Sequence, residues 1–211
     1  MHLLNILLAI TATPALSLSI PSLRNINPRQ VQDFTGRARI LVVNSTGYIY
    51  DVPDAYNKVI GCINNVGKVA PVSSKNCAIF EKKGDYPTKI VSPEGNNCTH
   101  FNVAQPVNQD SYYGKDSYAW YCGVTGEKES KGPGWFDSET YYTINGFDHP
   151  YICSGNIGCS RDMPAPPAGP DGRPAKDFSP LPLWMYYWGG EEYHVVKGHV
   201  EVLLLWDLLK N

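Results

Sequence analysis

The histidines near the C-terminus are the residues with the clearest potential for chemistry. The segment EEYHVVKGH places His194 and His199 close to several glutamates, including Glu192 and Glu201. Two imidazoles and a carboxylate can bind a metal ion or carry out acid–base catalysis. On an unbroken strand this five-residue spacing points the two rings to opposite faces, so a bulge or turn at Gly198 is needed to bring them together. A catalytic role for His194, His199 and Glu192 is one hypothesis; the alternative is a set of surface polar residues that flank a hairpin turn.

Other recognisable catalytic patterns are missing from the chain. His100 and His149 stand alone, and each is expected to be a loop or exposed-strand residue rather than a base. No GxSxG nucleophile motif, HExxH metal motif, phosphate-binding loop or dinucleotide glycine pattern occurs. Adjacent Glu191 and Glu192 would point apart on a strand, which does not suit a glycosidase pair. We therefore expect neither a cofactor nor a metal ion.

Aromatic residues offer a second kind of site. Residues 184–188 contain four aromatic rings, and further aromatics precede them. Exposed rings stack on sugars or bases, so a flat row of them would form a binding platform. The alternative is that these rings bury into the core or anchor a long loop, as large aromatics mostly do in small β-domains. The candidate binding residues are Trp184, Tyr186, Tyr187 and Trp188.

The N-terminal segment and the cysteines indicate the compartment. Residues 1–18 have the layout of a secretory signal peptide: an apolar run is followed by small residues and a cleavage site near Ser17. An even number of cysteines behind such a segment predicts disulfides, and the absence of a CxxC pair argues against zinc. The six cysteines are Cys62, Cys77, Cys98, Cys122, Cys153 and Cys159.

Glycosylation motifs and charge agree with secretion. Sequons at Asn44 and Asn97 predict surface positions, although Cys98 in the second sequon lets disulfide formation compete with glycan attachment. The formal net charge of −2 argues against bulk binding to nucleic acid or to an anionic membrane. We therefore expect a secreted, extracellular glycoprotein that has no membrane partner and does not bind nucleic acid.

Strands must position these residues. Short runs of Val, Ile, Tyr and Phe, bounded by Gly, Asn, Pro and Ser, begin near residue 39 and predict a mostly β domain over residues 39–211. The expected class is a single disulfide-stapled antiparallel β-sandwich or barrel. Residues 19–38 are polar and are interpreted as a flexible leader. The Pro-rich stretch 161–183 predicts a long irregular insertion at about residues 125–182.

The C-terminal strand has the clearest register. In HVEVLLLWDLL the even-numbered positions from Val200 to Leu208 are all apolar, which predicts that they face the core. The odd-numbered positions from His199 to Asp207 are mixed, as expected of a strand whose other face is partly wet.

Several segments together resemble a known family. VIGCINNVGKVAPVSSKNCAIF, TKIVSPEGNNCTHFNV, YAWYCG and a closing Leu-x-Trp strand resemble the β-rich C-terminal domain of fungal ribonuclease T2 enzymes and its stand-alone homologues. The resemblance covers about residues 39–123 and 192–209. It implies the accessory domain without the nuclease, because the HGLWP-like and KHGTC-like catalytic segments do not occur here. The Pro-rich insertion and Cys153/Cys159 depart from the pattern. Dimeric β-barrel allergen-like proteins of fungi are the structural alternative.

Order and spacing suggest how the cysteines pair. We expect each to bond to its neighbour in sequence, which is one of fifteen possible connectivities. Each bond would close a short loop and stabilise the fold by about 2–4 kcal/mol. The expected pairs are Cys62–Cys77, Cys98–Cys122 and Cys153–Cys159.

Two functional hypotheses follow. The first is a secreted, non-catalytic binding or accessory β-domain with an effector-like role. Its ligand would be a glycan, a cell wall or a host molecule. The second is a small secreted hydrolase, namely a ribonuclease that uses His194 and His199. The missing catalytic segments and the aromatic-rich insertion favour the first, so we expect a protein that is not an enzyme.

Overall fold

The computed structural model describes residues 34–48, 51–109, 118–123, 139–144, 146–154, 158–186 and 195–209. Its regular structure is almost entirely antiparallel β-strand. The only helical element among these residues is one 3-10 turn, η1 (Ala55–Lys58). The expected mostly β class is therefore confirmed.

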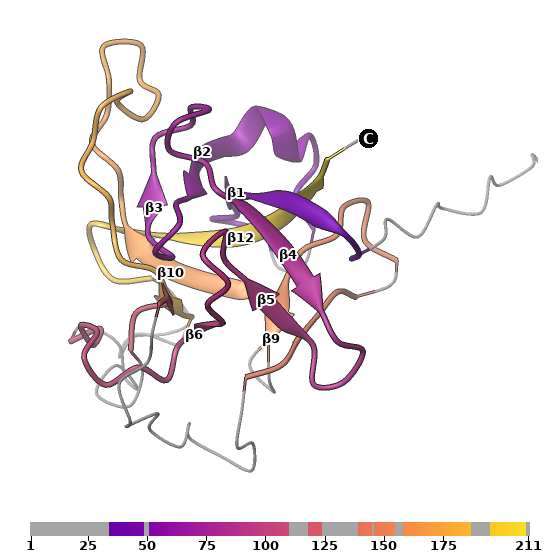
Figure 1. Cartoon of the computed structure of the whole chain (residues 1–211). Helices are drawn as coiled ribbons and strands as arrows, with labels where there is room; N and C mark the ends of the chain where they lie inside the picture. The colour runs from indigo at the N-terminus through magenta and orange to yellow at the C-terminus, as the bar shows by residue number, and fades with distance from the viewer. Residues whose placement is uncertain are drawn as a thin grey trace, which may run out of the picture. The chain divides into compact units, whose positions relative to one another are not determined.

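Eight strands form one curled sheet (Figure 1). They are β1 (Arg37–Asn44), β2 (Val59–Ile63), β3 (Val69–Ala70), β4 (Ile79–Lys83), β5 (Lys89–Val91), β10 (Ser160–Pro164), β11 (Trp184–Met185) and β12 (His199–Leu208). The strand order is β11-β10-β12-β1-β2-β3. Strand β1 pairs with β12 on one side; on its other side, its first half pairs with β4 and its second half with β2.

Two small sheets complete the regular structure. One pairs β6 (Cys98–Thr99) with β7 (Tyr121–Cys122), and the other pairs β8 (Tyr141–Tyr142) with β9 (Cys153–Ser154). Among the described residues the large sheet does not close through a pair of its named strands; an isolated bridge joins Val69 of the edge strand β3 to Leu181, which precedes the other edge strand β11. The structure therefore shows an antiparallel β fold without showing the expected sandwich or barrel.

Alternating apolar residues of β12 build a core on both faces of the large sheet. On one face Val202, Leu204 and Trp206 join the larger hydrophobic cluster, as the sequence register predicts. On the other face Leu203 and Leu205 are 2% and 1% exposed and belong to a second cluster. This face is therefore partly wet, as the sequence predicts: residues in and before η1 cover Leu203 and Leu205, while His199, Glu201 and Asp207 are only partly buried.

The Pro-rich stretch is not irregular throughout. Its first residues form β10, which pairs with β12 from Ser160 opposite Leu203 to Pro164 opposite His199. Arg161, expected in a loop, is fully buried. The prediction failed here because SRDMP lacks the β-branched residues typical of strands. Pairing with β11 and β12 satisfies its backbone groups instead.

The domain begins slightly earlier than its expected boundary at residue 39. Strand β1 starts at Arg37, and Ala38 is fully buried. The last residues of the predicted leader therefore belong to the sheet. The predicted signal peptide, residues 1–18, and the leader up to residue 33 lie outside the described residues.

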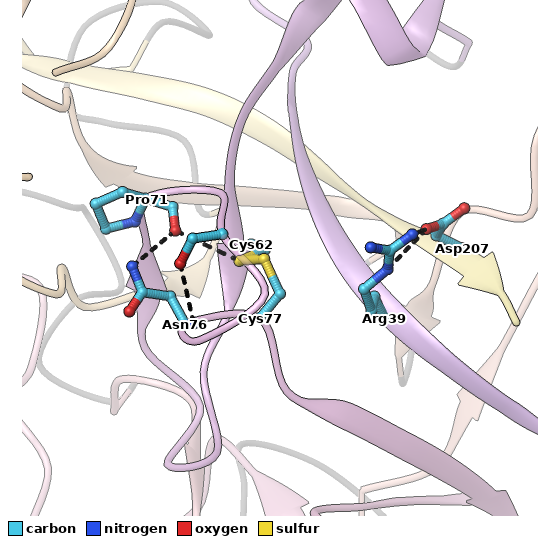
Figure 2. The surroundings of a disulfide bond; sticks show 7 residues. Arg39, Cys62, Pro71, Asn76, Cys77 and Asp207 are labelled. Atoms are coloured by element: carbon cyan, nitrogen blue, oxygen red, sulfur yellow. Dashed lines mark hydrogen bonds and ion pairs between the residues drawn. A yellow bond between two sulfur atoms is a disulfide. The ribbon is translucent and has the colours of Figure 1, made fainter. Parts of the chain in front are cut away.

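All six cysteines form disulfides in the pairs expected from their order: Cys62–Cys77, Cys98–Cys122 and Cys153–Cys159. Figure 2 shows the first bond beside Asn76, whose side-chain amide donates to the Pro71 carbonyl at 3.0 Å. Three disulfides indicate a protein of an oxidising, extracellular-type environment. In the described part of the chain, no helix has the length and apolar character needed to cross a membrane.

Candidate functional site

The structure describes only some of the candidate residues. Outside the described residues lie His194, Glu192, Tyr187 and Trp188. His199, Trp184 and Tyr186 are described. His199 and Trp184, assigned by sequence to two different kinds of site, come into direct contact.

Strands β10, β11 and β12 bring these side chains together. Asp162 lies opposite Trp184 on one side and Glu201 on the other, so the three side chains share one face of the sheet. His199 is two residues from Glu201 and lies on the same face. Its Nδ1 is 2.8 Å from Asp162 Oδ1. Its ring stacks on the indole of Trp184, with centroids 5.9 Å apart and planes at 4°.

Two carboxyl groups meet in this cluster. The Asp162 carboxylate also accepts a hydrogen bond from Asn108 Nδ2. Burial raises the pKa of Glu201; a hydrogen bond with Ser160 opposes this rise, and repulsion by Asp162 adds to it. Burial likewise raises the pKa of Tyr186, with further contributions from both carboxylates. The cluster thus holds an imidazole oriented by a carboxylate, beside a carboxyl group biased toward its protonated form. Such a pair has acid–base capacity.

Trp184 does not present an open aromatic surface. Trp184 is 7% exposed, and its Nε1 donates to the Pro106 carbonyl at 2.9 Å. One face of the ring is covered by His199. A buried indole with these contacts supports the sheet rather than stacking on a sugar. Nor does any group of three or more His, Cys, Asp or Glu side chains in the described ranges form a metal-binding arrangement.

A second histidine–carboxylate pair lies in the core. His100 Nδ1 is 2.7 Å from Glu139 Oε1, and the backbone N–H of His100 donates to Glu139 Oε2, also at 2.7 Å. Both side chains are 2% exposed. His100 lies in the bend that follows β6, as expected of a loop residue, but it is buried and does not stand alone. Its partner lies 39 residues away in sequence, where no local pattern points to it.

The protonation of this pair follows from its burial. Burial lowers the pKa of His100 below its ordinary value. Burial alone would raise the pKa of Glu139. The charge of His100 and the two hydrogen bonds that His100 makes to Glu139 oppose this rise, as does the charge of Arg161, and together they lower the pKa to about 2. At neutral pH the Glu139 carboxylate therefore accepts one hydrogen bond from a neutral imidazole and one from the His100 backbone N–H.

Trp120 connects this pair to the disulfide-linked strands β6 and β7. Its ring stacks with that of His100, with centroids 6.1 Å apart. Its Nε1 donates to the Tyr141 hydroxyl at 2.7 Å, and that hydroxyl donates to the Cys98 carbonyl at 2.9 Å. All these side chains are buried, so the network holds β6, β7 and β8 together rather than meeting a ligand.

A cleft of about 630 Å³ opens next to the large sheet. Val200 lines it, and this residue neighbours His199 in β12, so it points away from the His199 cluster. A volume of this size is typical of small-molecule sites. The polar and aromatic part of the lining comprises Asn44, Thr46, Tyr48, Tyr56, Asn57, Lys58 and Arg173.

One wall of the cleft is formed by η1 and the residues near it. Tyr56 is 55% exposed, its hydroxyl donates to Asp207 Oδ1 at 3.3 Å, and its ring packs edge-on against His149. Partial burial and the Asp207 charge raise the pKa of Tyr56. Lys58 follows in the same turn, and its Nζ lies 4.8 Å from the centroid of the Tyr48 ring, a cation–π contact.

A second wall of the cleft is a compact turn within residues 165–175. The Gly169 N–H donates to the Arg173 carbonyl at 2.5 Å, which closes the turn. Asp171 Oδ1 accepts the Arg173 N–H at 3.1 Å, and Gly172 has a φ of 75° that favours glycine. Part of the predicted irregular insertion thus forms an ordered wall that carries Arg173.

Sequence reasoning missed the cleft residues. Apart from Val200, they come from three separate segments, near residues 44–48, 56–60 and 165–174. The sequence offered two signals: an aromatic residue close to a cationic one at Tyr56 and Lys58, and a Pro-Asp-Gly turn before Arg173. Neither signal indicates that these segments face each other, because that depends on how β10 and β12 pair.

The two sequons differ in setting. Asn44 is half-buried at the end of β1, lines the cleft, and accepts the Thr46 N–H with its Oδ1 at 3.0 Å. Asn97 is exposed, and the following Cys98 is bonded to Cys122. Glycan attachment at either asparagine stays a prediction.

No protein-family model matches this chain, and no curated protein or solved structure matches it either. The resemblance to the C-terminal domain of ribonuclease T2 enzymes therefore stays a prediction.

Proposed function

We propose that this protein is a secreted, non-catalytic binding protein whose ligand is a glycan of a cell wall or a host surface. The observation that carries the proposal is the cleft, where the exposed ring of Tyr56 lies among amide and cationic side chains. Aromatic faces with neighbouring hydrogen-bonding groups are suited to sugar rings, which have apolar faces and hydroxyl edges. The three disulfides and the signal-peptide layout support secretion.

The family resemblance supports the same reading. An accessory β-domain without its nuclease is expected to act by binding. The buried Trp184 argues that binding does not use the first ring of the 184–188 segment. The cleft replaces that segment as the proposed site.

A polysaccharide and glycan-array screen with purified protein tests the proposal. We expect binding to at least one glycan. Tyr56→Ala should weaken it by about tenfold or more, which corresponds to roughly 1.4 kcal/mol. Tyr56→Phe keeps the ring and should retain most of the affinity. If Trp188→Ala abolishes binding while Tyr56→Ala does not, the site belongs to the 184–188 segment instead. Binding to no glycan at all contradicts the proposal.

A second candidate function, a small hydrolase such as a ribonuclease, is favoured by one observation. Asp162 orients His199 as a carboxylate orients a catalytic imidazole, and Glu201 beside them has a raised pKa. RNA cleavage that is lost in His199→Ala but kept in Tyr56→Ala would support this function over the first.

A further inference from the structure

We propose that the cleft selects acidic saccharides, with Lys58 and Arg173 binding a uronate carboxylate while Tyr56 stacks on the sugar ring. This inference rests on the proposed glycan-binding function and adds the charge of the ligand. It concerns a specificity that neither the sequence motifs nor the resemblance assigns.

The charge of the lining carries the inference. Among the described residues that line the cleft, Lys58 and Arg173 are the charged ones, and none is acidic. They come from different walls of the cleft, one from η1 and one from the 165–175 turn. A chain with a net charge of −2 thus has a locally cationic cleft. An anionic group between the walls would meet both cations with charge-assisted hydrogen bonds.

Two tyrosines have distinct roles in this arrangement. Tyr48 holds the Lys58 ammonium over its ring at 4.8 Å, which orients the cation without neutralising it. Tyr56 is left to present its ring, since it is 55% exposed and fixed at its hydroxyl by Asp207. Asp207 does not compete for the cleft cations, because Arg39 pairs with it at 2.8 Å (Figure 2).

The remaining polar lining fits a sugar better than a nucleic acid. Asn44, Thr46 and Asn57 contribute amide and hydroxyl groups that can both donate and accept, as sugar hydroxyls require. A polyphosphate backbone is bound by cations that follow the strand along a groove. The described lining offers two cations from separate segments and no such run.

A second cleft of about 530 Å³ provides an internal control. Its lining also contains two lysines, Lys75 and Lys176, but Asp177 stands beside them. Its one ring, Phe178, is 8% exposed. With a carboxylate present and no open aromatic face, this cleft should not bind the same ligand.

The test compares two polymers that share one backbone: polygalacturonate, and polygalacturonate fully esterified with methyl groups. The wild-type protein, as secreted and after enzymatic deglycosylation, is titrated with each at low salt and at high salt. We expect binding to the acid form to be about tenfold or more tighter than to the ester. We expect this preference to shrink at high salt.

Substitutions in each cleft test whether the preference for the acid form arises in the first cleft. Lys58→Gln/Arg173→Gln should remove the preference for the acid form, and Tyr56→Ala should weaken binding to both forms. Lys75→Gln/Lys176→Gln removes the same charge from the second cleft and should leave the preference unchanged. Circular dichroism of each variant confirms that it is folded.

Each contrary result would overturn a different part of the proposal. Equal binding of acid and ester, both sensitive to Tyr56→Ala, overturns the charge selectivity and leaves the proposed function standing. Binding to neither polymer, nor to any glycan in the wider screen, overturns both. Single-stranded RNA that binds more tightly than polygalacturonate, with loss in Lys58→Gln/Arg173→Gln, overturns the saccharide assignment.

Discussion

Two histidine–carboxylate pairs in this protein have nearly the same local geometry. In each, Nδ1 lies 2.7–2.8 Å from a carboxylate oxygen, and the imidazole stacks on a tryptophan. The pairs differ in exposure: 2% for each side chain of His100–Glu139, against 12% and 4% for His199 and Asp162.

That difference in exposure separates their roles. A fully buried pair cannot reach a ligand, and removing one partner leaves a polar group without water or protein. The His199 pair lies in a polar cluster that keeps some contact with solvent, so it tolerates change better and retains acid–base capacity. Geometry alone therefore does not distinguish a structural dyad from a candidate active one; burial does.

The largest expected effect comes from removing the buried imidazole. His100→Leu leaves the Glu139 carboxylate in the core without its imidazole partner, which should lower the free energy of unfolding by about 3–5 kcal/mol. Urea denaturation measures it. His199→Leu is the matched change and should cost about 1–2 kcal/mol, because Asp162 keeps its bond to Asn108.

The double variant His100→Leu/Glu139→Leu sharpens this result. It removes both members of the pair and should recover part of the stability that His100→Leu loses. Equal losses for His100→Leu and His199→Leu would contradict the contrast between the two pairs.

Acid should destabilise the protein through the buried pair. The pKa of Glu139 falls from 4.5 to about 2 on folding, and that of His100 also falls on folding. In both cases the unfolded state binds more protons, so stability rises with pH. The contribution of Glu139, about 3 kcal/mol, is complete above pH 4.5 and is lost as the pH falls toward 2.

Thermal unfolding between pH 7 and pH 2 checks this dependence. The melting temperature should begin to fall below about pH 6.5, where unfolded His100 becomes protonated, and fall further below pH 4.5. Glu139→Gln should flatten the lower part of the curve. A variant curve as steep as that of the wild type would show that other groups cause the acid sensitivity.

A smaller effect is expected in the cluster around His199, which is less deeply buried than the His100 pair. Asp162→Asn removes the charge that raises the pKa of Glu201, so that pKa should fall toward its ordinary value, while burial keeps it above. Carbon-13 NMR titration of the Glu201 carboxyl measures it. The loss of stability should be about 1–2 kcal/mol, and an unchanged Glu201 pKa would rule out the coupling.

The smallest effect is expected from the ring beneath His199. Trp184→Phe keeps an aromatic face for His199 but loses the hydrogen bond to the Pro106 carbonyl, at a cost of about 1 kcal/mol. The matched Trp120→Phe should cost more, because it leaves the buried Tyr141 hydroxyl without its donor. Differential scanning calorimetry of both variants makes the comparison, and a reversed order would contradict it.

Local patterns in the sequence predicted a large part of the fold. The mostly β class, the core-facing residues Val202, Leu204 and Trp206, and the disulfide pairs could be read in advance. Strand β10 could not, because its residues are polar and its place in the sheet depends on pairing with distant β12.

The sites depended on the same long-range pairing. His199 and Trp184 were both named as candidates, but their contact and their common partner Asp162 appear only when β10, β11 and β12 lie side by side. The pairing of His100 with Glu139 and the joining of the cleft walls also cross long stretches of chain.

The sequence by itself thus determined the periodicity of the strands, the residues able to carry chemistry and the cysteine framework, because these follow from neighbours along the chain. Only the tertiary structure decided which histidine is buried, which aromatic ring is open and where the cations gather. Those properties are set by burial and by contacts between residues far apart in sequence, and no local pattern encodes them.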